Sequence, residues 1–108
     1  MPRRTRNPRH ETSDTPHFGV CRFVLRLHDV RSLKEKRSIS KSLLARARNR
    51  FNVSASEVGF LDSKTHLGLT FAAVSSGRAV IDSMFNEILQ GLDIDPRFEV
   101  EDYGQEYI

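Results

Sequence analysis

Basic side chains recur along residues 33–50 at intervals that could follow a phosphate backbone. On a helix, four of them fall within a sector of about 60°: Lys34, Arg37, Lys41 and Arg48. Lys36 adds to the positive field, and Glu35 is the one acid of this segment. Each cation that reaches a phosphate releases a condensed counterion. The segment therefore predicts a polyanion-binding helix, and a solvated face whose long stems cover apolar surface is the alternative.

Two further arginines belong to a segment with the periodicity of a strand. Residues 18–28 alternate between an apolar face and a face that carries Arg22 and Arg26. These arginines could extend the contacts of the basic helix to phosphates. Recognition by charge and shape, without reading of bases, is typical of proteins that bind structured RNA. We therefore predict a nucleic-acid interface that combines the helix with this strand.

The sequence contains no arrangement of side chains that indicates an enzyme. Cys21 lies on the apolar face of the first strand, where a free thiol behaves as a small apolar side chain. The four histidines lack the spacing of metal ligands. We expect a non-catalytic protein that has no metal site and no cofactor.

Charge is unevenly distributed along the 108 residues, although the formal net charge is only +3. Residues 18–51 hold ten Lys or Arg and two acids, a net +8, whereas residues 52–108 hold three and ten, a net −7. Such asymmetry can indicate a surface that binds polyanions. Alternatively, the basic and acidic segments neutralise one another across the fold.

The segments that must position these side chains alternate between strand and helix periodicity. Ser32 forms a capping box with Glu35 and opens a helix that should run to about Arg50. A second helix follows residues 75–77 and ends near Leu92, since Pro96 prevents its continuation. Strands are predicted at residues 18–28, 52–60, 65–74 and 98–103.

This order of elements predicts an α+β, ferredoxin-like split βαβ sandwich, β-α-β-β-α-β, whose four-stranded antiparallel sheet carries two helices on one face. The first and third strands are the most apolar, as the central strands of this topology should be. The second and fourth carry the charges expected at sheet edges. We therefore predict one domain over residues 18–108, because about 90 ordered residues suffice for a single modest core.

The sheet face without helices should present apolar side chains from three strands, namely Val20, Val24, Val58, Phe60, Ala72 and Val74. The pattern of stacking aromatics found in RNA-recognition sheets is absent from residues 65–74. An open aliphatic face is often covered by another subunit. We expect a homodimer with Val20, Val24, Ala72 and Val74 at its interface. A protein-interaction module without a nucleic-acid role is the alternative function.

Residues 1–17 are rich in Pro and Arg and poor in apolar side chains, which predicts a disordered basic arm. This arm is either an inert extension or a supplement to nucleic-acid binding. The chain has one cysteine, no apolar stretch of about 20 residues and no signal-peptide pattern. We therefore expect a cytoplasmic protein that does not enter membranes.

Two motifs match a known family. They are Ser-Leu-Lys-Glu-Lys-Arg at residues 32–37 and Phe-Asn-Val-Ser at residues 51–54. Residues 18–103 resemble the YlxP-like family of small bacterial proteins, whose function is unknown. The resemblance implies a ferredoxin-like fold. Members are commonly encoded beside translation-initiation and ribosome-assembly factors, so the resemblance also implies a role near the ribosome, with a ribosomal subunit as a possible partner. It provides no catalytic residues.

Overall fold

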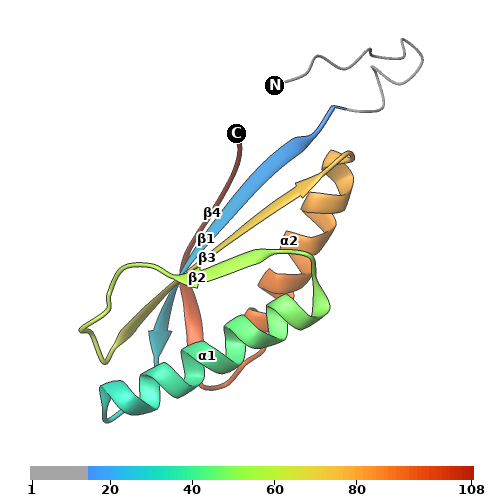
Figure 1. Ribbon diagram of the computed structural model, residues 1–108. Coiled ribbons are helices and arrows are strands. Elements are labelled where there is room, and N and C mark those ends of the chain that lie inside the picture. Colours follow the sequence, from blue (N-terminus) through green and yellow to red (C-terminus); the bar gives the residue numbers. More distant parts are fainter. Residues whose placement is uncertain (1–14) are drawn as a thin grey trace, which may run out of the picture.

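A computed structural model describes residues 15–108 of the chain. Six elements follow one another (Figure 1): β1 (His17–Leu27), α1 (Leu33–Arg50), β2 (Ser54–Glu57), β3 (His66–Ser75), α2 (Arg78–Asp93) and β4 (Phe98–Tyr107). This order confirms the predicted ferredoxin-like α+β fold. Of the predicted arm, residues 1–14 lie outside the described part, and His17 already belongs to β1.

The four strands form one antiparallel sheet in the order β2-β3-β1-β4. β1 and β3 are central and pair along almost their whole length, from His17 opposite Ser75 to Arg26 opposite His66. β2 and β4 are the two edge strands, as the charge pattern predicts. The chain therefore places its acidic last strand and its short second strand at opposite edges of the sheet.

One face of the sheet packs against both helices and forms a single core. Phe23 and Phe71 meet there edge to face with their ring centroids 5.8 Å apart. α2 contributes four buried apolar side chains at helical spacing, namely Ile81, Phe85, Ile88 and Leu92. α1 begins as its capping box predicts, since the Glu35 amide donates to the Ser32 hydroxyl at 3.1 Å. Burial of these apolar stripes fixes both helices on the sheet.

The two edge strands differ in length from the prediction. β2 ends at Glu57 rather than at residue 60, because Gly59 and Phe60 adopt φ values of 78° and 54° and turn the chain away. Val58 and Phe60 therefore lie in the β2–β3 loop rather than in a strand. β4 continues to Tyr107, beyond the predicted end at residue 103, because it pairs with β1 as far as Gly19.

Candidate nucleic-acid interface

α1 presents four exposed cations along one side, which we name the basic row: Lys34, Arg37, Lys41 and Arg48. Successive members are three, four and seven residues apart, so they follow one another along the helix axis. None of the four forms an ion pair with another residue in the range 15–108. Within the described part of the chain, therefore, no acidic side chain neutralises the positive charge of the row.

α1, which carries the basic row, lies beside the edge strand β2 (Figure 1). Arg48 donates from Nη2 to the Ala55 carbonyl at 2.5 Å, and the Ser40 hydroxyl donates to Glu57 Oε1 at 2.8 Å. On its other side α1 faces α2, where Arg50 pairs with Glu87 at 2.8 Å. The two sides of α1 therefore differ, because Arg50 is ion-paired on the side that faces α2, whereas no member of the basic row has an ion-pair partner among residues 15–108.

Lys36 does not belong to the phosphate-binding set that the sequence predicts. Its side chain is only 1% exposed, and its ammonium donates to the carbonyls of Phe60 and Ser63, at 2.7 Å for Ser63. Glu57 Oε2 lies 3.7 Å from Lys36 Nζ. A lysine held in this way cannot reach a phosphate in solution. We therefore correct the prediction for Lys36, whose contacts fasten the β2–β3 loop to α1.

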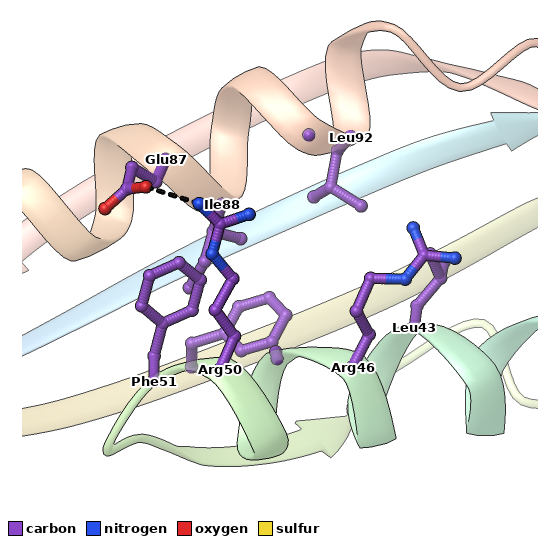
Figure 2. A pocket seen from close by; sticks show the side chains of 10 residues that line it. Leu43, Arg46, Arg50, Phe51, Glu87, Ile88 and Leu92 are labelled. Carbon is purple, nitrogen blue, oxygen red and sulfur yellow. Dashed lines mark hydrogen bonds and ion pairs between the residues drawn. The ribbon is translucent and has the colours of Figure 1, made fainter.

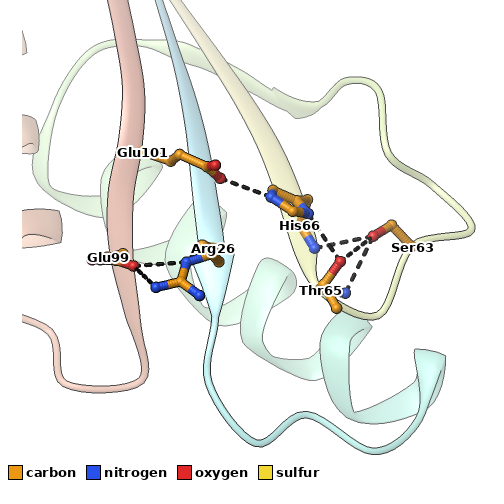
Figure 3. A network of polar contacts seen from close by, with 6 residues as sticks. All are labelled: Arg26, Ser63, Thr65, His66, Glu99 and Glu101. Carbon is orange, nitrogen blue, oxygen red and sulfur yellow. Dashed lines mark hydrogen bonds and ion pairs between the residues drawn. The ribbon is translucent and has the colours of Figure 1, made fainter.

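The predicted strand cations lie on the open sheet face, where the acidic strand β4 pairs with them. Arg22 Nη2 lies 2.8 Å from Glu106, and Arg26 Nε donates to Glu99 at 2.7 Å. The second of these pairs lies close to the His66–Glu101 contact of 2.7 Å (Figure 3). Neutralisation across the fold, one of the two alternatives for the charge asymmetry, therefore describes the open face, whereas the basic row stays unpaired.

The four residues predicted at the dimer interface all lie on the open sheet face, but they do not form one continuous apolar patch. Val20, Ala72 and Val74 line a shallow hollow together with the exposed side chains of Phe18 and Ile108. Val24 lies further along β1, between the ion-paired Arg22 and Arg26 on the same strand face. The apolar part of the open face is therefore confined to the end where β1 begins and β3 ends.

Three further features bear on catalysis and on the binding of small ligands: the cysteine, a pocket between the helices and the distribution of metal-binding side chains. Cys21 is buried in the core as predicted, and burial raises the pKa of its thiol to about 12, so the reactive thiolate is scarce near neutral pH. A pocket of about 70 Å³ lies between α1 and α2 (Figure 2), and pockets for small molecules are several times larger. Residues 15–108 contain no group of three or more His, Cys, Asp or Glu that could hold a metal ion.

No helix within residues 15–108 combines the length and the apolar character needed to span a bilayer. The fold and its surface define a small α+β domain with a basic helix beside one sheet edge and an acidic strand at the other. Residues 18–105 match the model of a family described as "Protein of unknown function (DUF503)", and the chain belongs to this family. It is 38% identical over 82 residues to "Uncharacterized protein YlxP" of Bacillus subtilis (strain 168). This match covers 76% of the chain and 87% of that relative.

Proposed function

We propose that this protein is a non-catalytic, cytoplasmic RNA-binding factor that uses the basic row on α1 to contact phosphates. The observation that carries the proposal is the absence of ion-pair partners for the row within residues 15–108. The one acid of the neighbouring strand β2, Glu57, contacts Ser40 and Lys36 instead. The usual gene neighbours of the family favour ribosomal RNA as the ligand. Binding of this kind is electrostatic and depends on the shape of the RNA.

The salt dependence of RNA binding tests this proposal, with charge-matched variants that differ only in position. We expect wild-type protein to bind a labelled hairpin derived from ribosomal RNA with an affinity that falls steeply as salt rises. Lys34→Gln with Lys41→Gln removes two phosphate contacts and should lower the slope of log affinity against log salt by about 2. Circular dichroism should show an unchanged fold, because both side chains are exposed.

Arg22→Gln with Arg26→Gln is the matched control, since it removes the same charge from the open face. Because these arginines already pair with Glu106 and Glu99, the slope should stay at the wild-type value. If both double variants lowered the slope of log affinity against log salt equally, RNA binding would respond to net charge alone. That result would contradict an RNA interface at the basic row. Absence of wild-type binding at low salt would contradict RNA binding altogether.

We also propose a second function, self-association through the apolar end of the open sheet face. The supporting observation is the hollow near Val20 and Val74, where Phe18 and Ile108 remain exposed. A second copy related by a two-fold axis would cover the same residues on both subunits. Such a dimer is compatible with RNA binding, because the basic row lies on the helix layer at the β2 edge rather than on the open face.

A further inference from the structure

The pocket between α1 and α2 combines apolar walls with charged side chains at its mouth (Figure 2). Its volume is about 70 Å³. Its walls are formed by six apolar side chains from the two helices, the C-cap of α1 and β3, namely Leu43, Ala47, Phe51, Phe71, Ile88 and Leu92. Protein interiors are close-packed and contain few voids, so an open apolar pocket in the helix layer is a place where another group can dock.

The volume of the pocket determines which groups fit into it. A cavity of about 150 Å³ accommodates one benzene ring, which corresponds to about 25 Å³ for each carbon. On this scale, 70 Å³ accommodates about three carbons, the size of the branched end of a Leu or Val side chain. Aromatic rings and nucleobases are too large. The pocket therefore suits a single aliphatic side chain rather than a metabolite or a base.

The charges at the mouth of the pocket are not balanced. Arg50 pairs with Glu87 across the gap between the helices, with Arg50 Nη2 2.8 Å from Glu87 Oε1 (Figure 2). Asp95, which follows α2, accepts a hydrogen bond from Arg97 Nη2 at 2.7 Å, and this bond, with a smaller contribution from the charge of Arg46, lowers the pKa of the Asp95 carboxyl. Arg46 itself is exposed, and no residue in the range 15–108 forms an ion pair with it. Within these residues, the mouth therefore carries one cation without an anionic partner.

We propose that the pocket binds a protein partner by one aliphatic side chain that lies next to a carboxylate in the partner's sequence. The apolar walls enclose the side chain, and Arg46 pairs with the carboxylate. An anchor side chain that fills a desolvated pocket, with polar contacts around it, is a common arrangement at protein interfaces. The inference goes beyond the proposed function, because the pocket contains no member of the basic row.

Three blocked tripeptides test the inference by NMR titration of the backbone amides. Acetyl-Asp-Leu-Asp-amide carries the expected anchor and charge, and it should shift the signals of Gly91 and Leu92, two residues that line the pocket, in a saturable way. We expect a Kd in about the millimolar range, because so small a probe makes few contacts. Acetyl-Asp-Phe-Asp-amide should leave these signals unchanged, because its ring is too large for the pocket. Acetyl-Asn-Leu-Asn-amide should bind about three- to fivefold more weakly, because it lacks an ion pair whose exposure limits its contribution.

Three substitutions locate the binding of these peptides. Arg46→Gln should remove the preference for Asp over Asn, so that both leucine peptides bind with equal affinity. Arg37→Gln is the matched control, since it removes the same charge from an exposed position of α1 outside the pocket and should keep the preference. Ala47→Leu adds three carbons from within the chain, so it should fill the pocket and abolish binding of the leucine peptides. Because Arg46 is exposed, Arg46→Gln keeps the test decisive whatever Ala47→Leu does to the fold.

Equal binding of the Leu and Phe peptides, or binding that persists in folded Ala47→Leu, would overturn the aliphatic anchor. An unchanged preference for Asp in Arg46→Gln would overturn the role of Arg46. Unshifted Gly91 and Leu92 signals with the Asp-Leu-Asp peptide would overturn the docking site itself. If these signals shifted with protein concentration in the absence of peptide, the occupant would be a second copy of the chain and not a separate partner. None of these outcomes bears on RNA binding by the basic row, which lies outside the pocket.

Discussion

Lys36 is a charged residue in the protein interior, so the cost of removing its ammonium from water must be offset by other contacts. An unpaired ammonium in a protein interior is strongly unfavourable, and here two backbone carbonyls and the nearby Glu57 carboxylate compensate for its lost water. Glu57 is itself oriented by the Ser40 hydroxyl. The polar cluster therefore joins α1, the end of β2 and the following loop at one point.

Replacing Lys36 by Met should destabilise the protein by about 3 kcal/mol, because the carbonyls and Glu57 would lose a buried cationic partner. Urea denaturation followed by circular dichroism measures the change as a lower midpoint. Lys34→Met is the control, since Lys34 is exposed and its loss should alter stability by no more than about 0.5 kcal/mol. Similar midpoints for both variants would mean that the contacts of Lys36 contribute little.

The burial of Lys36 could be predicted from the sequence by closer use of helix periodicity. Lys36 lies four residues before Ser40 and seven before Leu43, which places it on the buried stripe of α1. The prediction placed Lys36 among the phosphate-binding residues because of its charge, although helix periodicity indicated a buried position. Its partners could not be foreseen, because the carbonyls of Phe60 and Ser63 approach it only through the irregular path of the loop.

At the scale of elements, the junction between β2 and β3 depends on a glycine. A Cβ at Gly68 would lie 2.0 Å from the Val58 carbonyl oxygen, and Val58 in turn donates its amide to the Gly68 carbonyl at 2.9 Å. The close approach lets the chain leave β2 and pass over β3 before it turns at Gly59. The position of Phe60 on the open face follows from this path.

Gly68→Ala should therefore destabilise the protein by about 1–3 kcal/mol, since a backbone oxygen cannot rotate away from the added methyl group. Gly91→Ala in α2 should have the opposite sign, with a gain of about 0.5 kcal/mol, because its Cβ would meet nothing within 4 Å. Thermal denaturation of the two variants compares them directly. A stability for Gly68→Ala at or above that of wild type would show that β2 and the loop shift without cost.

Strand identities were predictable from alternation, but the ends of the edge strands were not. Residues 52–60 alternate well enough to suggest a long strand, whereas the positive φ values of Gly59 and Phe60 end it early. β4 extends further because its later residues pair with β1, including Gly104 opposite Arg22. Edge strands depend on neighbours that are distant in sequence, so local patterns define their ends poorly.

At the scale of the whole molecule, topology converts a charge difference along the sequence into one across the sheet. The order β2-β3-β1-β4 separates α1, which carries the basic row and lies beside β2, from the acids of β4. The pairing of β1 with β4 also brings Glu99 and Glu106 to Arg26 and Arg22. Once the ferredoxin-like fold is predicted, this adjacency follows from the strand order, and the ion pairs of the open face could have been anticipated.

The oligomeric state is a property of the same scale, and a single substitution in the apolar hollow tests it. Sedimentation velocity should show a dimer for wild-type protein and a monomer for Val74→Asp, since a carboxylate would be buried without a partner at the interface. Val80→Asp on α2 is the matched control, because Val80 is 52% exposed and Val74 49%. A wild-type monomer, or dissociation by both variants, would contradict association through this face.

The contact between Arg48 and Ala55 has a consequence for solubility. In the β2–β3 pairing, Val58 bonds with Gly68, so the alternate residues Ala55 and Glu57 direct their backbone groups away from β3. The Arg48 guanidinium occupies the Ala55 carbonyl at 2.5 Å and places a charge against this free strand edge. A further strand could pair with β2 at this edge only by displacing Arg48 from the Ala55 carbonyl or by burying its charge. Arg48, which belongs to the proposed RNA surface, thus also disfavours edge-to-edge aggregation through β2.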